Sequence, residues 1–208
     1  MMSTETLASL PSEMATARSY HHGNLRSALL EHAERALVAR GVTELSLREL
    51  AREVGVSHAA PRRHFADKQA LLDALAEDGF ERLGHELAAS MAAADPSLRD
   101  QLAAFARAYV RFATEHGALL ELMFAGKHRA DRLREAADRA FAPALSLFVA
   151  AQAAGHVVAG DTERVGIVAL ATLHGIASLA NNGMLAAADL DEIVEEAVDR
   201  LVLGLRPR

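Results

Sequence analysis

Residues 46–65 read SLRELAREVGVSHAAPRRHF, and this stretch decides the fold. Its first half has apolar residues at helical spacing, and Ser46 stands three places before Glu49, which is the spacing of a capping box. Gly55 then interrupts the pattern, and Ser57 is placed to cap a second helix. The stretch therefore predicts two short helices, LRELAREV and HAAPRRHF, joined by a tight glycine turn.

The sequence on both sides is also helical in pattern, because apolar residues recur three and four places apart and alternating β-branched runs are missing. Gly41 stands where the preceding helix needs a C-terminal cap, and Asp67 where the next long helix needs an N-terminal cap. We expect the long helix to bury a stripe formed by Leu71, Leu72, Leu75, Phe80, Leu83 and Leu87. The fold class is therefore all-α, with about nine helices at residues 24–40, 47–54, 58–65, 67–93, 96–116, 117–124, 128–154, 161–184 and 189–204.

Charge divides the chain into a basic head and an acidic body. The 208 residues have a formal net charge of −6, yet residues 18–68 carry nine Lys and Arg against six Asp and Glu, and the remaining residues carry 13 against 22. An acidic chain is not expected to coat nucleic acid without selectivity. We expect residues 1–17 to be a flexible tail, residues 18–68 a three-helix helix-turn-helix domain, and residues 69–208 a larger helical domain, connected by the helix that begins at about residue 67.

The second short helix has the chemistry of a DNA-recognition helix. Its side chains are mostly small or basic, namely His58, Ala59, Ala60, Arg62, Arg63 and His64. Small residues let a helix backbone approach base edges or thymine methyl groups, while arginine and histidine reach guanine acceptors or phosphates. The alternative is a plain helical hairpin whose arginines are solvated on its outer face. The residues favour the first interpretation and leave the second open.

Residues 20–80, which begin YHHGNLRSALL and end LLDALAEDGF, resemble the N-terminal domain of TetR/AcrR-family regulators in one continuous block. The resemblance implies a ligand-responsive, DNA-binding transcriptional regulator that binds double-stranded operator DNA. It implies most simply a repressor that a small apolar or amphipathic effector releases from a near-palindromic operator. With the helix chemistry above, it gives these DNA-contacting residues: Ser46, Arg48, His58, Ala59, Ala60, Arg62, Arg63, His64 and Lys68.

One position departs from the family pattern. Family members usually carry tyrosine where this chain has Arg62. We expect an arginine there to keep the phosphate contact and to be able to read guanine, so operator preference is not transferable from relatives. Pro61 lies near the start of its short helix, where a missing amide costs less than in a helix interior.

The C-terminal stretch TLHGIASLANNG resembles the subgroup of this family named for a Trp-His-Gly motif, with Leu173 in the tryptophan position. The resemblance implies a homodimer in which the last two helices pair with their twofold copies. Small residues that would permit close approach of the facing helices are Gly166, Ala169, Gly175 and Ala177. The alternative is that these helices belong to an ordinary intramolecular core.

A candidate effector pocket lies among aromatic and methionine side chains of the C-terminal half, which suit an apolar ligand. The candidate ligand-binding residues are Phe105, Tyr109, Phe112, Met123, Phe124, Phe141, Phe148 and, as polar handle, His174, with His116, His128 and Asn181 as further polar candidates. The same spacing is also typical of plain core packing.

Other function classes have little support in the sequence. The chain has no cysteine, and its ten histidines are scattered without an HExxH pair, so we expect no metal site and no cofactor. It has neither a GxSxG elbow nor a glycine-rich phosphate loop, so we expect no enzyme, and a small helical enzyme that uses one of the histidines with nearby carboxylates is the weakest alternative. A helical protein–protein adaptor that docks through its acidic half is the remaining alternative, but it leaves the basic head unexplained.

The sequence shows no targeting or membrane-spanning pattern. The first twenty residues lack the basic start and apolar core of a secretory signal, and charges interrupt each long helical stretch. We therefore expect a cytoplasmic protein with no membrane partner.

Overall fold

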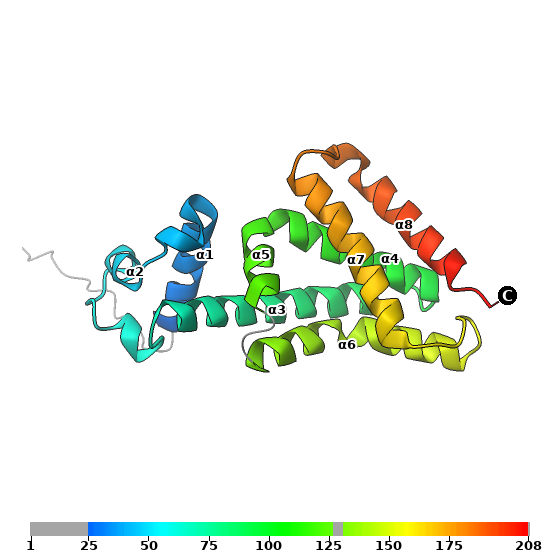
Figure 1. Cartoon of the computed structure of the whole chain (residues 1–208), viewed down its shortest axis with the longest axis horizontal. Helices are drawn as coiled ribbons and strands as arrows, with labels where there is room; N and C mark the ends of the chain where they lie inside the picture. The colour runs from blue at the N-terminus through cyan, green and yellow to red at the C-terminus, as the bar shows by residue number, and fades with distance from the viewer. Residues whose placement is uncertain (1–24, 127–130, 208) are drawn as a thin grey trace, which may run out of the picture.

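The computed structural model describes residues 25–126 and 131–207, and all regular structure within them is helical. The α-helices are α1 (Leu25–Glu44), α2 (Leu47–Val54), α3 (Lys68–Ala93), α4 (Leu98–Glu115), α5 (Gly117–Gly126), α6 (Asp131–Ala153), α7 (Thr162–Asn181) and α8 (Leu190–Gly204), with 3-10 turns η1 (Pro61–Arg63) and η2 (Ala187–Asp189). In Figure 1, α1 and α2 form a head at one end, α3 runs from the head into the larger domain, and α7 and α8 lie toward the other end. The expected all-α class and helix-turn-helix head are confirmed, whereas the expected tail at residues 1–17 lies outside the described residues.

Two glycines with positive φ shape the head. Gly41 has φ 75° and ψ 172°, a conformation available almost only to glycine, and it ends the regular part of α1 where the sequence predicted. Gly55 is left-handed at φ 77°, and the N–H groups of Gly55 and Val56 donate to the carbonyls of Arg52 and Ala51 at 3.2 and 2.9 Å. These two bonds form a Schellman motif, which turns the chain sharply after α2.

The long helix α3 connects the head to everything else. The Asp67 carboxylate accepts from the N–H of Ala70 at 2.8 Å, which confirms the predicted cap. All six residues of its predicted apolar stripe are buried. Gly79 and Gly84 let neighbouring helices approach closely, because a Cβ at Gly79 would lie 2.7 Å from Met123 Sδ on α5 and one at Gly84 would lie 3.0 Å from Ala140 Cα on α6.

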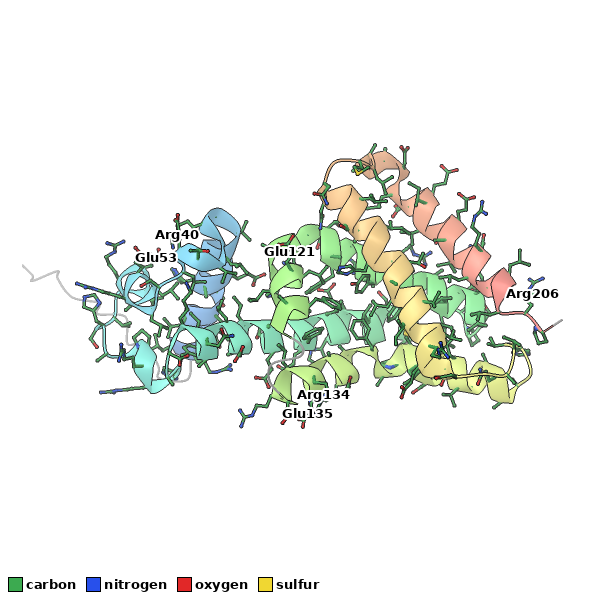
Figure 2. All side chains as sticks on the ribbon, in the orientation of Figure 1. Arg40, Glu53, Glu121, Arg134, Glu135 and Arg206 are labelled. Carbon is green, nitrogen blue, oxygen red and sulfur yellow. The ribbon has the colours of Figure 1, made fainter. Side chains whose placement is uncertain are left out.

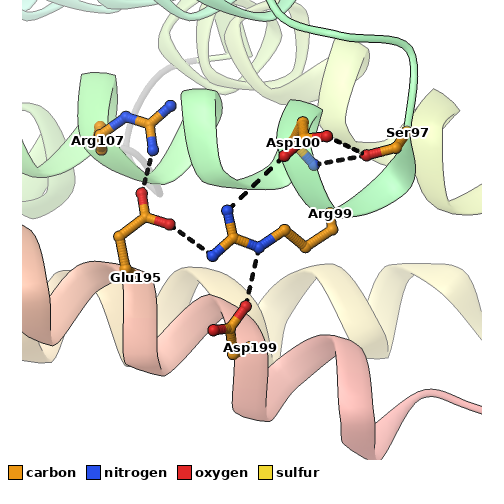
Figure 3. A network of polar contacts seen from close by, with 6 residues as sticks. All are labelled: Ser97, Arg99, Asp100, Arg107, Glu195 and Asp199. Carbon is orange, nitrogen blue, oxygen red and sulfur yellow. Dashed lines mark hydrogen bonds and ion pairs between the residues drawn. The ribbon is translucent and has the colours of Figure 1, made fainter.

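Helix α4 lies against α3, α7 and α8. Arginine side chains of α4 form ion pairs with carboxylates of α8 (Figure 3). Arg99 donates to Asp199 at 2.9 Å and is paired with Glu195 at 2.7 Å, and Arg107 is paired with the same Glu195. Ser97, which the sequence reading did not identify as a cap, accepts from the N–H of Asp100 at 3.0 Å and starts the helix.

The predicted α-helix over residues 58–65 is wrong, and the described chain has eight α-helices instead of about nine. Pro61 has no N–H to donate to the Ser57 carbonyl, so the helical ladder cannot pass through it. A turn forms first, in which the Ala60 N–H donates to the Ser57 carbonyl at 2.9 Å. A three-residue 3-10 turn follows. Proline therefore shortens the expected recognition helix to a tight turn.

The predicted capping box is also wrong. Ser46 does occupy the N-cap position in extended conformation, but its side chain makes no capping hydrogen bond, so the reciprocal pair with Glu49 does not form. Helix α2 begins instead with the backbone bond from Leu50 N–H to Ser46 carbonyl at 3.0 Å. Free N–H groups at a helix start that is open to solvent are satisfied by water.

Helix α7 departs from the expectation that charges interrupt every long helix. Its 20 residues contain a window of mean hydropathy 1.2, which is long and apolar enough to cross a membrane by those two measures alone. Only 22% of that window is buried. A helix whose exposed apolar face packs on a partner protein has the same length and hydropathy.

Candidate nucleic-acid interface

The recognition segment, residues 57–65, is anchored by two buried side chains. Pro61 and Phe65 are both buried, and the guanidinium of Arg26 on α1 stands 5.8 Å from the centre of the Phe65 ring. The Phe65 N–H donates to the Pro61 carbonyl at 2.9 Å, which closes the turn around the two anchors. The segment is therefore held against the head although it is not a regular helix.

The other side chains of the segment are mostly exposed. His58, Ala59, Arg62, Arg63 and His64 are exposed, and Ala60 is half-buried. The two arginines form no hydrogen bond or ion pair with any residue in the described part of the chain. Small and cationic groups thus share one exposed end of the head, as a surface that meets DNA requires.

The remaining predicted DNA contacts flank this segment. Arg48 is exposed in the first turn of α2, and Ser46 is half-buried immediately before it. Lys68 begins α3, where its ammonium donates to the Thr43 carbonyl at 2.8 Å and so ties α3 to the end of α1. Its other N–H groups remain available for a phosphate, because an ammonium has three.

Elsewhere on the head, one carboxylate lies between two basic side chains. Glu53 is paired with Arg40 at 3.1 Å and lies 3.7 Å from His32 (Figure 2). This pairing on α1 and α2 contrasts with the free arginines of η1. The charge of Arg40 is therefore locally neutralised, whereas the charges of Arg62 and Arg63 are not neutralised by any described residue.

A polar contact that the sequence did not predict joins the head to the C-terminal domain. Arg82 on α3 donates to both carboxylate oxygens of Glu34 on α1, at 2.6 and 3.3 Å. His116, at the end of α4, lies 3.2 Å from the same carboxylate. Burial acts to lower the pKa of Arg82, but the hydrogen bond and charge of Glu34 outweigh burial, so the pKa is raised. Because these residues are 34 to 82 positions apart, no local sequence signal could have shown the contact.

Several predicted effector residues come together as one aromatic cluster, defined here as Phe80, Phe105, Tyr109, Phe124, Phe141 and His174. Neighbouring rings have centroids 5.0 to 6.5 Å apart. The Tyr109 hydroxyl and His174 Nδ1 are 2.9 Å apart, and burial raises the pKa of Tyr109 above its usual value. Phe80 was predicted only as core, and its position on the buried stripe gave no signal of this role.

The other predicted effector residues lie outside the aromatic cluster. Met123 fills the space above Gly79, Phe112 packs on His116 with ring centroids 4.7 Å apart, and Phe148 is buried in the core. Surface cavities on the described residues include five that no predicted effector residue lines. Of the further polar candidates, His128 lies outside the described residues, and Asn181 donates to the Ala113 carbonyl at 3.0 Å. The aromatic cluster is thus packed on itself.

The small residues of α7 divide between two faces. A Cβ at Gly166 or Gly175 would meet nothing within 4 Å, so these two glycines face open space. Ala169 and Ala177 are buried within the chain, so their predicted place on the outer face is wrong. The outer face carries larger apolar residues instead, including Ile167 and Val168, which are 66% and 59% exposed.

A small three-element head with a free basic turn, attached to a larger helical domain, defines a helix-turn-helix DNA-binding protein. Residues 29–75 match the family model described as bacterial regulatory proteins, tetR family. Residues 102–201 match the model described as tetracyclin repressor-like, C-terminal domain. The chain belongs to the TetR family and is a DNA-binding transcriptional regulator. Regulators of this family bind operator DNA and usually dimerise and bind small molecules, while the Trp-His-Gly subgroup stays a prediction.

Solved structures share the fold. A protein of unknown function from Rhodococcus sp. RHA1 is 49% identical, with a TM-score of 0.84 over 91% of this chain and 100% of that one. A TetR family transcription regulator from Marinobacter aquaeolei VT8 is 17% identical, with a TM-score of 0.75 over 89% of this chain and 97% of that one. The fatty acid degradation regulator FadR from Bacillus halodurans is also 17% identical, with a TM-score of 0.67 over 88% of this chain and 97% of that one. At these lower identities the likeness shows the fold alone. No curated protein matches the chain.

Proposed function

We propose that this regulator is a homodimeric repressor that holds a near-palindromic operator in its ligand-free state. The observation that carries the proposal is the recognition segment, whose unpaired Arg62 and Arg63 stand beside the small Ala59 and Ala60 on a turn anchored by Pro61. This combination supports base-edge contact by the small residues and phosphate or guanine contact by the arginines. Ser46, Arg48, His58, His64 and Lys68 complete the proposed DNA contacts.

The dimer is proposed to form through α7 and α8. Exposed apolar side chains on these helices, among them Ile167, Val168 and Leu203, support an interface that is covered in the assembled protein. The open faces of Gly166 and Gly175 allow a partner helix to approach closely. Two heads about 34 Å apart on one face of DNA would then read a twofold-related site.

The effector is proposed to be a small apolar or amphipathic molecule that binds the C-terminal domain at the aromatic cluster. Because the rings pack on one another, a ligand must displace some of these contacts, and α4 and α7 would move with them. A ligand that binds the moved state about 100-fold better supplies about 2.7 kcal/mol toward release of DNA. Linkage requires operator DNA to weaken effector binding by the same factor.

The test is a salt-dependent titration of the protein against the DNA that flanks its own gene, with a scrambled duplex of the same composition as control. Specific binding of one dimer per site, with an affinity that falls steeply as salt rises, is the expected result. Equal affinity for both duplexes, or specific binding by a monomer, would contradict the proposal.

A further inference from the structure

The α4–α5 corner, residues 112–117, joins two helices without a loop. Only His116 lies between the end of α4 and the start of α5, with φ −121° and ψ 40°. Its N–H donates to the Phe112 carbonyl at 2.9 Å, and its carbonyl accepts from the Leu120 N–H at 2.8 Å. Because one residue with backbone bonds to both helices forms the bend, the two helix ends move as one unit.

The corner contacts the DNA-binding head through polar side chains. His116 Nδ1 lies 3.2 Å from the Glu34 carboxylate on α1, and Arg82 Nη2, from the guanidinium that donates to the same carboxylate, lies 3.4 Å from the imidazole Nε2. The guanidinium also stands 6.0 Å from the centre of the Phe112 ring. The Glu34 side chain is only 20% exposed, so the contact is partly shielded from screening by salt. The position of α1 is therefore tied to the corner as well as to α3.

The corner also contacts the end of α7. Asn181, the last residue of that helix, donates from its side-chain amide to the Ala113 carbonyl at 3.0 Å. Ala113 belongs to the last turn of α4, where a carbonyl has no backbone donor within its own helix. A Cβ at Gly117 would lie 3.1 Å from Asn181 Nδ2, so the glycine lets α7 approach this closely. One asparagine thus bonds the corner to α7.

Helix α7 carries the features on which the proposed regulation depends. His174, two turns before Asn181, contacts the Tyr109 hydroxyl in the aromatic cluster, and the outer face carries the exposed Ile167 and Val168. Helix α7 lies against α4, and α5 lies against α1 of the head (Figure 1). A continuous series of described contacts therefore leads from α7 through the corner to the head.

We propose that the α4–α5 corner is a coupling element that makes the position of the head depend on the position of α7. Asn181 and His116 are its positioning residues. A shift of α7 pulls on the Ala113 carbonyl, and the corner passes the shift to Glu34. The use of this coupling by an effector rests on the proposed function, whereas the coupling itself is a property of the folded chain. Coupling of this kind requires that a change at one end alter the other end only while the intermediate contact is present.

The test is amide hydrogen exchange of the full-length protein, measured in α1 residues 31–38 for Asn181→Ala and for the matched control Asn182→Ala. Asn182 is the next residue, but its side-chain amide donates to the Ser178 carbonyl of its own helix at 2.7 Å. We expect Asn181→Ala to raise the exchange rates in α1 by about threefold to fivefold, as when one hydrogen bond that restrains a local opening is lost. Asn182→Ala should leave these rates unchanged.

His116→Ala gives a readout that a merely structural role of Asn181 would not change. In this background the corner has lost its contact with Glu34, so Asn181→Ala should cause no further rise in α1 exchange. Residues 136–144 of α6 are the internal reference, because they report general loss of stability. Equal rises in the two asparagine variants, an undiminished rise in the His116→Ala background, or an equal rise in residues 136–144 would overturn the proposal.

Operator binding is measured separately on the same samples. Coupled exchange in a protein that binds no specific duplex would support the corner as a coupling element and contradict the proposed repressor function. Specific operator binding, with equal α1 exchange in Asn181→Ala and Asn182→Ala, would do the opposite, so the two proposals fail independently.

Discussion

The two ends of the molecule use arginine in opposite ways. On η1, Arg62 and Arg63 are exposed and form no ion pair with a described residue, whereas on α4 Arg99 and Arg107 are held by carboxylates of α8. A paired guanidinium fixes one helix on another, and its charge is locally neutralised. An unpaired one keeps its charge for a ligand. The molecule therefore has a DNA-binding end and an end whose charges hold helices together.

The largest effect is expected from Val168→Asp on the outer face of α7. A carboxylate buried without a partner at a dimer interface costs about 3 kcal/mol or more, so the dimer should dissociate and operator affinity should fall by about 100-fold or more. Light scattering coupled to gel filtration and a DNA titration measure both. Val149→Asp on α6 is the matched control, because Val149 is 52% exposed and lies outside the proposed interface. Dissociation by Val149→Asp alone would place the interface elsewhere.

Arg62→Ala should weaken operator binding by about 1–3 kcal/mol, with loss of base preference at one position only if the arginine reads guanine. Arg107→Ala removes an equally charged side chain from the α4–α8 contact and should leave DNA affinity unchanged. Fluorescence anisotropy with operator variants measures both. Equal operator affinity of Arg62→Ala and the unmodified protein would show that the turn is not the reading element.

The junction between the two ends should depend on charge complementarity. Glu34→Arg and Arg82→Glu each place like charges together across a partly buried contact, so each should lower the free energy of unfolding by about 1–2 kcal/mol. The double swap restores opposite charges and should recover part of that loss in urea unfolding. Strictly additive losses would mean that the two side chains do not stabilise the contact through their charges.

Tyr109 predicts a pH effect in the C-terminal domain. Burial raises its pKa in the folded state, so above about pH 10 the unfolded chain releases a proton that the folded chain retains. Stability should therefore fall by up to about 1.4 kcal/mol per pH unit in that range, and Tyr109→Phe should remove this part of the slope. An unchanged alkaline slope in the variant would show that Tyr109 ionises over the same pH range in the folded and unfolded chains.

The smallest effect is expected from Glu195→Gln in the α4–α8 contact. Exposed ion pairs contribute about 0.2–1 kcal/mol, so the free energy of unfolding should fall by less than about 1 kcal/mol. The affinity for operator DNA should not change. A loss of operator affinity in this variant, as large as that of Arg62→Ala, would erase the distinction between the two ends.

Local sequence signals predicted the fold where a single residue decides the backbone. The positions of Gly41, Gly55 and Asp67 gave two turns and a cap correctly, because φ preference and side-chain capping act within a few residues. The same local logic failed at the recognition segment. There Pro61 was treated as tolerable near a helix start, but it interrupts the ladder of a segment too short to continue past it.

The candidate site was predictable in its chemistry and only partly in its geometry. Residue type identified Arg62 and Arg63 as free cations and several members of the aromatic cluster as neighbours. It could not identify Phe80 as their partner, nor the contact of Arg82 with Glu34, because those depend on how α3 packs against helices distant in sequence. The prediction also placed Ala169 on the outer face of α7, although it is buried. Residue spacing shows that a helix has two faces, but it does not show which face lies inside the protein.

The unbroken length of α3 has a mechanical consequence. Its 26 residues span about 39 Å at 1.5 Å per residue, with the head at one end and Phe80 of the aromatic cluster at the middle. A tilt of about 5° at the far end displaces the head by about 3 Å, close to the rise of one base pair, about 3.4 Å. A rotation smaller than the usual scatter of helix crossing angles is therefore enough to shift one head by a full step along the DNA.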